Sequence, residues 1–463
     1  MSGPSVAPAA GVSFGADAEV LIIGGGAAGM VAALAATQVG AEPVVVERDA
    51  VPRGSTALSA GLIPAAGTRW QRAAGIDDDA ERFAADIRRK AKGEADEAVL
   101  DAVTRGIAGT LEWLADAHGL AFSVVTDFLY PGHSAHRMHG LASRSGAELI
   151  DRLRAAVERA GVAVLTEAVA RTLFVEDDGA VRGVGIVRPD GSEERVACRA
   201  LVLACNGYGG NRELVRRHIP ELAEAVWFGH DGNRGEAVLW GEALGAELRH
   251  LSGHQGHGSV AHPHGILITW AVIMQGGVQV NALGERFSNE SEGYSEQAAR
   301  VLAQPGGVAW DVFDERLAGI ARQFEDFRAA EAAGAVVRAD SVAALAEAMK
   351  VPEAALAAAL AERGAPDRFG RDWTGLAPLA PPYCAVRVTG ALFHTQGGLA
   401  IRGDARVKRE AGGVFPNLFA AGGAAAGLSG SRAAGYLSGN GLLTAVALGG
   451  IAGREAARFS RMR

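Results

Sequence analysis

The hydrophobic pattern near the N-terminus predicts a strand, a tight turn, a helix and a second strand. EVLII over 19–23 and PVVVE over 43–47 are short aliphatic runs, and an alanine-rich stretch with helical spacing lies between them and ends at Gly40. Apolar runs of this length that are bounded by glycine are typical of buried strands. We therefore expect the strand–helix–strand unit from which α/β sheets are built.

The turn of this unit carries a GxGxxG spacing at Gly24, Gly26 and Gly29, and Glu47 stands at the end of the second strand. Gly24 would make the turn, Gly26 would let backbone amides approach a pyrophosphate, and Gly29 would allow close helix packing. Glu47 would accept hydrogen bonds from an adenosine ribose. Glycine runs also occur in loops that bind nothing, but the flanking strands and the acid about 20 residues later favour dinucleotide binding.

Further apolar runs extend the pattern into a sheet. They cover 162–165, 172–176, 181–187 and 200–204, and the last runs straight into the glycine-rich segment CNGYGGN. A strand that ends in glycines allows a cofactor to approach the backbone closely.

The middle of the chain has a different character. From about residue 250 it is irregular and rich in histidine, and alanine-rich helical patterns follow before ALFHTQGGLAI and VFPNLFAAGGAAAG restore the strand and glycine pattern. We expect an α/β protein in which a Rossmann-like domain is interrupted by an α+β capping domain. The expected boundaries are a flexible tail at 1–16, the Rossmann-like domain at 17–247 and 385–463, and the capping domain at 248–384.

Composition and charge narrow the class of partner. The 463 residues are 49% hydrophobic, the net charge is -8, and no block of basic residues occurs, so neither nucleic acid nor an anionic membrane is expected as a partner. The three cysteines form no CxxC pair, which favours a reducing cytoplasm. The chain starts without a signal-peptide pattern, and no apolar run approaches the roughly 18 residues of a membrane span. We expect a small-molecule partner.

Several ordered motifs carry a resemblance that spans nearly the whole chain. They are VLIIGGGAAGMVAALAA, STALSAGLIPAAGT, LVLACNGYGGN, GGVQVNALGERFSNE, FHTQGGLAI and LFAAGGAAAG. The chain resembles the flavoproteins that include soluble fumarate reductases, succinate dehydrogenase flavoprotein subunits and 3-ketosteroid dehydrogenases. The resemblance implies FAD bound across the Rossmann-like domain, a cap that closes over the isoalloxazine ring, and oxidation or reduction of a carbon–carbon bond next to a carbonyl or carboxyl group.

The glycine-rich segments and the resemblance together imply the cofactor contacts. Members with covalent FAD usually attach it through a histidine, whereas the matching stretch here, 53–58, reads RGSTAL, so we expect non-covalent FAD. The family often has an acid after AAG that holds a cofactor hydroxyl, and this chain has Gly423 there. The expected cofactor-binding residues are Gly24, Gly26, Ala28, Gly29, Glu47, Arg48, Ser55, Thr56, Ser59, Ala60, Gly61, Val169, Ala204, Asn206, Gly207, Asn211, Gly422, Gly441, Leu442 and Leu443.

Reoxidation of the cofactor needs an electron acceptor. Only one GxGxxG unit is visible, so we do not expect a separate nicotinamide site. Oxygen, a quinone or another electron carrier would take the electrons.

Tyr294 is the expected catalytic base. Fumarate reductases have a proton-delivering arginine shortly after the RFxNE motif, but RFSNESEGYSEQ has Tyr294 in that neighbourhood and no arginine before Arg300. Ketosteroid dehydrogenases have a tyrosine there that removes a proton beside the ketone. A phenol of pKa about 10 is a poor base at neutral pH unless donors or positive charge stabilise its phenolate. The alternative is that Tyr294 only packs, with its hydroxyl satisfied.

The C-terminal segment RAAGYLSGNGLLTA supplies the expected carbonyl site. By resemblance to ketosteroid dehydrogenases, Tyr436 and the amide of Gly439 would hydrogen-bond the substrate ketone, with Ser438 as a possible further donor. Such donors stabilise a developing enolate by about 3 to 4 kcal/mol each. The helix that starts near Gly441 would direct its N-terminus at the flavin.

His394 and Arg432 match the fumarate reductase side of the family, in which such residues bind a substrate carboxylate. The alternatives are a core histidine and a surface salt bridge. Together with Tyr436 they predict a mixed site for a small oxo-acid, either open-chain or cyclic, and Tyr130 is a further candidate for the pocket wall. The histidines of GHQGHGSVAHPH lack acidic or cysteine partners at ligand spacing, so no metal is expected.

Three hypotheses follow. The first is an FAD-dependent dehydrogenase that forms a carbon–carbon double bond next to a ketone. The second is an enoate reductase of the fumarate type, which His394 and Arg432 would favour. The third is a flavin-holding subunit that docks electron carriers and has no substrate chemistry of its own.

Overall fold

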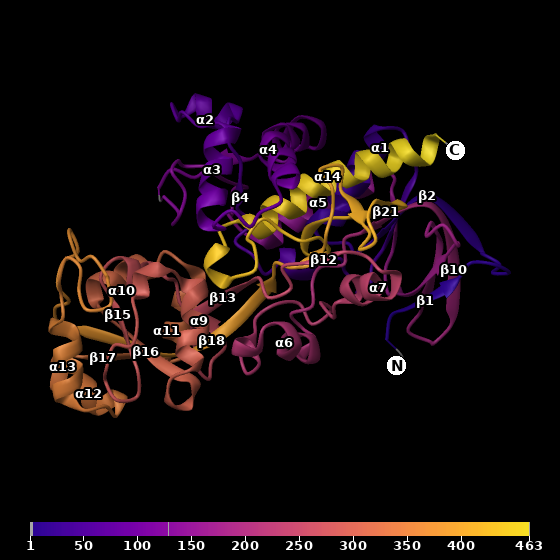
Figure 1. Cartoon of the computed structure of the whole chain (residues 1–463). Coiled ribbons are helices and arrows are strands. Elements are labelled where there is room, and N and C mark those ends of the chain that lie inside the picture. The colour runs from indigo at the N-terminus through magenta and orange to yellow at the C-terminus, as the bar shows by residue number, and fades with distance from the viewer. Residues whose placement is uncertain (1–2, 128, 463) are drawn as a thin grey trace. The chain divides into compact units, whose positions relative to one another are not determined.

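A computed structural model describes residues 3–127 and 129–462, and the chain divides into two compact units (Figure 1). The first unit comprises Met1–Leu214, Gly229–His254 and His394–Arg463, and the second comprises Val215–Phe228 and Gln255–Phe393. The second unit overlaps the range 248–384 that is expected for a capping domain, but it differs from that range at both ends and includes an additional earlier segment. The reason is that strand β18 (Tyr383–Thr395) continues past residue 384 and pairs with β11 (Val226–Trp227).

The first unit is built on a large, mainly parallel sheet. Among the described residues this sheet has nine strands, in the order β1-β8-β9-β10-β2-β3-β7, with β21 on β10 and β20 on β21. The strands are β1 (Ser5–Pro8), β2 (Ala16–Ile23), β3 (Pro43–Val46), β7 (Ala163–Leu165), β8 (Val169–Val175), β9 (Val181–Val187), β10 (Glu193–Leu203), β20 (Arg406–Lys408) and β21 (Val414–Ala420).

The strands that the pattern predicts end at one common edge of this sheet. Leu203 of β10 is in register with Ile23 of β2 and with Ala420 of β21, and Ile23 is in register with Val46 of β3. These four strands run parallel, so their carboxyl ends lie side by side. The glycine-rich segments that follow them are thereby brought together.

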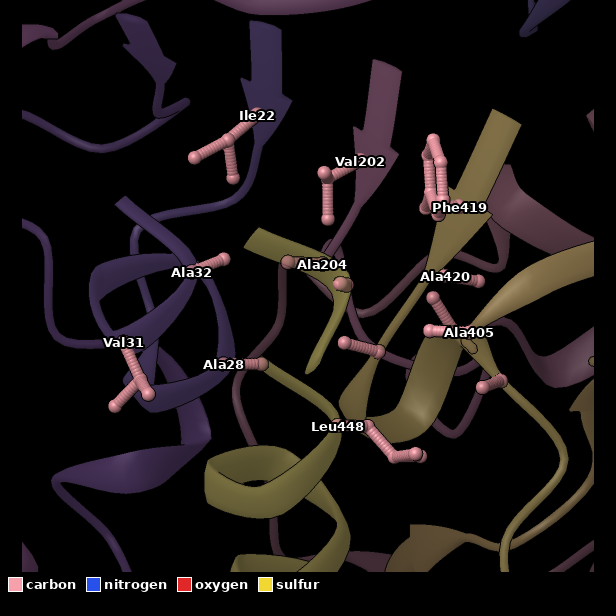
Figure 2. Close-up of a cluster of buried hydrophobic side chains, with 14 of the residues drawn as sticks. Ile22, Ala28, Val31, Ala32, Val202, Ala204, Ala405, Phe419, Ala420 and Leu448 are labelled. Carbon is pink, nitrogen blue, oxygen red and sulfur yellow. The ribbon is translucent and has the colours of Figure 1, made fainter. Parts of the chain in front are cut away.

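Two helices of small residues cover the sheet above this edge. Helix α1 (Ala27–Gln38) is buried over its first ten residues, and α14 (Asn440–Arg461) packs against it. A Cβ added at Gly449 or Gly453 of α14 would lie 2.5 or 2.1 Å from a backbone oxygen of α1, so the two helices approach very closely. Figure 2 shows the apolar layer between these helices and the sheet, in which Val202 of β10 and Phe419 of β21 lie across from Ala28 and Leu448.

The remaining elements of the first unit surround this core. Its other helices are α2 (Arg69–Ala73), α3 (Ala80–Lys90), α4 (Glu97–His118), α5 (Gly146–Arg159) and α7 (Glu236–Leu244), and α6 (Arg212–His218) contains the boundary between the units. Short strands form two further sheets: β4 (Ile63–Pro64), β5 (Ser123–Val124) and β6 (Met138–Gly140), and β12 (Leu248–Arg249) with β19 (Gly398–Leu399).

The N-terminal segment differs from the expected flexible tail. Residues 5–8 form β1, which pairs in parallel with β8, Ser5 opposite Thr172. The two hydroxyls also lie 3.0 Å apart. The edge of β8 offers unpaired backbone groups, and the tail satisfies them.

The second unit has its own sheet and its own apolar core. Its sheet follows the order β14-β13-β18-β16-β15, with β11 and β17 also pairing with β18. The strands are β13 (His254–Ala261), β14 (Ile266–Leu267), β15 (Val278–Val280), β16 (Val308–Asp314) and β17 (Val336–Ala339). The helices are α8 (Ala271–Met274), α9 (Tyr294–Leu302), α10 (Glu315–Ala321), α11 (Glu325–Ala332), α12 (Val342–Met349) and α13 (Glu353–Ala361).

Over 3–127 and 129–462, none of the helices combines the length and the apolar character needed to cross a membrane.

Candidate active site

The turn after β2 is shaped for a phosphate group. Gly24 has a φ of +108°, and a Cβ there would lie 2.4 Å from the Ala204 oxygen, so only glycine fits. A Cβ at Gly29 would lie 1.8 Å from the Gly24 oxygen. Helix α1 begins directly after Gly26 and has no acidic residue in its first turn. Its N-terminal amides and its dipole therefore favour an anion such as a pyrophosphate.

Glu47 lies at the adjacent strand end and is 7% exposed. One carboxylate oxygen accepts from the Gly25 amide at 2.6 Å, and the other accepts from the Asp49 amide at 2.9 Å. These amides fix the carboxylate beside the glycine turn and leave lone pairs for a ribose hydroxyl. Arg48 is held by the Gly232 carbonyl and by Glu236, 3.3 Å away.

The segment that follows β3 lines the first turn of α1. Thr56 Oγ1 accepts from the Ala27 amide at 3.0 Å, and Ser55 Oγ accepts from Asn233 Nδ2 at 2.8 Å. Ser59 Oγ donates to the Thr56 carbonyl at 2.7 Å, and Gly61 (φ +64°) leaves no room for a side chain against the Ser145 backbone. This segment therefore places hydroxyl groups beside the N-terminus of α1.

The exposed Ala60 belongs to the same segment, and Val169 begins β8. Asn211 is engaged differently from the expectation, because its Oδ1 accepts from the amides of Glu213 and Leu214 and so caps the start of α6. Its cofactor contact stays a prediction.

Asn206 and Gly423 form a close pair at the ends of β10 and β21. Asn206 has a left-handed φ of +65°, and its Oδ1 accepts from the Gly207 amide at 2.8 Å. A Cβ added at Gly423 would lie 2.2 Å from this oxygen. An acidic side chain therefore has no space at 423 while Asn206 stands there, which explains physically why this position is glycine.

The start of α14 brings His394 and Tyr436 together. Their ring centroids lie 5.3 Å apart at 74°, and a Cβ added at Gly441 would lie 3.1 Å from His394 Nε2. Gly439 has a φ of +86° at the N-cap of α14, against Pro64. Burial lowers the pKa of His394 to about 4, so its imidazole is neutral at pH 7. The result is a group of neutral donors beside a helix N-terminus, which suits a carbonyl oxygen that gains negative charge.

A family model described as an FAD binding domain matches residues 19–442. The chain belongs to this family of flavoproteins. The glycine turns, the N-terminus of α1 and the fixed carboxylate of Glu47 fit that cofactor, and the flavoprotein binds FAD. It is an oxidoreductase that acts on CH–CH groups.

Relatives and solved structures agree with this assignment. A probable fumarate reductase of Shewanella frigidimarina is 30% identical over 448 residues, which cover 96% of this chain and 75% of that protein. The open conformation of a flavocytochrome c3 fumarate reductase matches with a TM-score of 0.84 and 28% identity, over 98% of this chain and 80% of that chain. A 3-ketosteroid-Δ4-(5α)-dehydrogenase from Rhodococcus jostii has the same fold, with a TM-score of 0.77, 24% identity and coverage of 98% and 100%.

The segment before α14 in this flavoprotein is supported by a buried ionic cluster that the sequence analysis missed. The carbonyl of Ser438 accepts from His133 Nε2 at 2.9 Å, and His133 contacts Arg137, which is 1% exposed. Arg137 pairs with Asp78 at 2.8 Å and with Asp86 at 2.5 Å. Isolated histidines and acids give no periodic signal, so only the fold reveals that they position Ser438.

Arg432 pairs with an acid, and Tyr130 packs in a small apolar cluster. The Arg432 side chain is 62% exposed and lies 3.5 Å from Glu94, as in the salt-bridge alternative. Tyr130 packs on Leu62, Val125 and Met138, and burial raises its pKa. Their substrate contacts stay predictions.

Tyr294 belongs to the second unit and is the first residue of α9. Its ring stacks on His257 with centroids 4.9 Å apart, and His257 also stacks on Phe393 at 5.4 Å. Burial lowers the pKa of His257 to about 3, so this ring adds no positive charge that would stabilise a phenolate.

The RFSNE motif fixes the segment that leads to Tyr294. Arg286 pairs with Glu290 at 2.8 Å and with Asp367 at 2.7 Å, and Arg371 lies 3.1 Å from Glu290. All four side chains are buried, so removing any one of them would strand a charge. The motif therefore has a structural role in the second unit, and the catalytic role of Tyr294 stays a prediction.

Proposed function

We propose that the protein is an FAD-dependent dehydrogenase that introduces a carbon–carbon double bond next to a ketone. The observation that carries this proposal is the contact of Tyr436 and neutral His394 at the N-terminus of α14. A ketone oxygen bound by these groups becomes an enolate oxygen when the neighbouring carbon loses a proton. Neutral donors and a helix N-terminus stabilise that charge more than they stabilise the ketone.

The reaction divides between protein and cofactor. Tyr294, once ionised to its phenolate, would take the proton from the carbon next to the ketone, and the carbonyl site would hold the resulting negative charge on oxygen. FAD supplies the acceptor for the hydride that leaves the next carbon. The double bond forms between these two carbons, and oxygen, a quinone or another carrier then takes the two electrons.

The substrate is a small oxo compound, and a cyclic oxo-acid remains our specific proposal. Its carboxylate would be bound by Arg432, which would have to exchange Glu94 for the substrate. A planar guanidinium suits a carboxylate, and an exposed ion pair costs little to break. We therefore expect Arg432→Ala to weaken turnover of an oxo-acid more than turnover of the ketone that lacks the acid group.

A fumarate-type enoate reductase is the second candidate. It is favoured by the probable fumarate reductase that is 30% identical to this chain. Proton delivery to the substrate would then fall to Tyr294, because the segment between the RFSNE motif and Arg300 has no arginine.

Anaerobic spectroscopy of the purified holoprotein tests both candidates. A dehydrogenase loses its oxidised flavin absorbance when saturated cyclic ketones or oxo-acids are added without a reductant. A reductase instead regains absorbance, after chemical reduction, when unsaturated acids are added. Bleaching by none of the saturated compounds, with rapid reoxidation by enoates, would overturn the first candidate in favour of the second. Tyr294→Phe should abolish either reaction, whereas a flavin-holding subunit would be unaffected.

A further inference from the structure

His394 stands at one end of a chain of buried polar side chains that the sequence analysis did not identify. Gln396 Nε2 lies 2.7 Å from His394 Nδ1, and Gln396 Oε1 accepts from the Ser429 hydroxyl at 2.7 Å. Ser429 Oγ in turn accepts from Asn440 Nδ2 at 3.1 Å. Gln396, Ser429 and Asn440 are 5%, 1% and 0% exposed, so water does not compete for these bonds.

The hydrogen bonds that link these buried side chains all run in one direction. The Asn440 amide donates to Ser429, the Ser429 hydroxyl donates to Gln396, and the Gln396 amide donates to His394. Nδ1 of His394 then has to be an acceptor, because a neutral imidazole carries a single N–H. The carbonyl of Thr395 lies farther from Nδ1, at 3.4 Å, and is the weaker partner. The proton of His394 is therefore on Nε2, the atom that lies against Gly441 at the start of α14.

Gln396 adds no charge that would oppose the effect of burial, which lowers the pKa of His394 to about 4. A carboxylate at this position would favour an imidazolium, whereas a carboxamide donates to the ring and provides no compensating negative charge. The site that results offers Nε2–H as a neutral donor next to Tyr436. A neutral donor discriminates less in favour of an anion than an imidazolium does.

We propose that Gln396, held by Ser429 and Asn440, fixes His394 as a neutral Nε2–H donor and so makes the site select a carbonyl oxygen over a carboxylate. Gln396 is a positioning residue, and its effect passes through His394. This inference rests on the proposed function, because it assigns His394 to the ketone and not to an acid group of the substrate.

The state of His394 can be measured without turnover. Nitrogen-15 NMR of the histidine-labelled holoprotein at pH 7, assigned with His394→Gln, should give an unprotonated Nδ1 and a protonated Nε2. A protonated Nδ1 or an imidazolium at pH 7 would overturn the proposal even if the enzyme turns over ketones. This spectrum is informative also when no substrate is found, so failure of the proposed function is distinguished from failure of the inference.

Selectivity is measured with one uncharged and one charged probe that share a six-membered ring, 2-cyclohexenone and cyclohex-1-ene-1-carboxylate, by their perturbation of the flavin spectrum. The wild-type protein should bind the enone at least tenfold more tightly, and Gln396→Glu should shift the ratio at least tenfold toward the carboxylate while protonating His394 at pH 7. Gln304→Glu, the same change in the second unit, should alter neither readout. Tighter carboxylate binding by the wild type, or an unchanged ratio in a folded Gln396→Glu protein, would refute the inference.

Discussion

Gly423 and Asn206 compete for one space beside the sheet edge where we expect the cofactor. The 2.2 Å separation between a Cβ at 423 and Asn206 Oδ1 is far below van der Waals contact. One polar side chain fits there, and this chain supplies it from residue 206. Asparagine is also among the few residues that adopt a left-handed φ without large strain, as position 206 requires.

Gly423→Glu should therefore weaken FAD binding at least tenfold, although it adds a polar group. The variant Asn206→Gly with Gly423→Glu should recover most of the affinity, because glycine vacates the space and tolerates the positive φ. Equilibrium dialysis of the apoprotein with FAD measures both. A double variant no better than Gly423→Glu alone would contradict the competition between these residues.

Tyr436 offers the most direct test of the carbonyl site. Tyr436→Phe keeps the ring against His394 but removes the hydroxyl, so kcat should fall by about 10²- to 10³-fold. FAD affinity should stay unchanged, since the ring still packs in the same place. Tyr383→Phe in the second unit is the control and should retain full activity. Equal losses in kcat for the two variants would show that Tyr436 holds no developing charge.

Helices α1 and α14 illustrate what the sequence could and could not predict at the scale of an element. The run at 19–23 and the glycines after it predicted β2 and the start of α1, because strand burial and phosphate turns leave strong local patterns. The contact of α1 with α14 was not predicted, because small residues have no amphipathic period that identifies a partner. β1 was missed for a similar reason, since only the open edge of β8 makes residues 5–8 extended.

The close approach of these helices predicts a strong penalty at Gly453. A Cβ there would lie 2.1 Å from the backbone oxygen of Ala32, so Gly453→Ala should lower the free energy of unfolding by about 1–3 kcal/mol or more. Gly109 in α4 has no atom within 4 Å of such a Cβ, and Gly109→Ala should stabilise by up to about 1 kcal/mol through helix propensity. Chemical denaturation of the two variants gives the comparison. If Gly453→Ala left the free energy of unfolding unchanged, the two helices would have to move apart at little cost.

On the scale of the whole molecule, the candidate site is assembled from sequence segments hundreds of residues apart. Motifs predicted the glycine-rich edge of the sheet and assigned His394 and Tyr436 to one candidate site, since the glycine spacing, FHTQGGLAI and the C-terminal segment are each recognisable alone. The hydrogen-bonded row of Gln396, Ser429 and Asn440 could not be predicted, because each is a single polar residue whose partner is known only from the folded structure. The same holds for residues 215–228, which join the second unit by pairing with β18.

The second unit also buries a carboxyl group that makes its stability depend on pH. Asp311 on β16 accepts from the Ser259 hydroxyl and from Gln279 Nε2, and burial raises its pKa from 3.8 to about 7. The unfolded chain releases this proton near pH 4 and the folded chain near pH 7, so the folded state binds more protons in between. The contribution of protonated Asp311 to the free energy of unfolding is therefore complete below about pH 4, and it is lost as the pH rises toward 7.

Asp311→Asn keeps a neutral side chain of the same shape at every pH, so it should remove this dependence. The free energy of unfolding of the variant minus that of the wild type should therefore be larger at pH 8 than at pH 5, by an amount on the order of 1 to 3 kcal/mol. Urea denaturation at the two pH values measures the difference, and Asp340→Asn, at an exposed position of the same unit, is the control. If the Asp311→Asn and wild-type proteins change in parallel between pH 5 and 8, the carboxyl is already ionised in the folded state. A cation or water would then have to reach it inside the sheet.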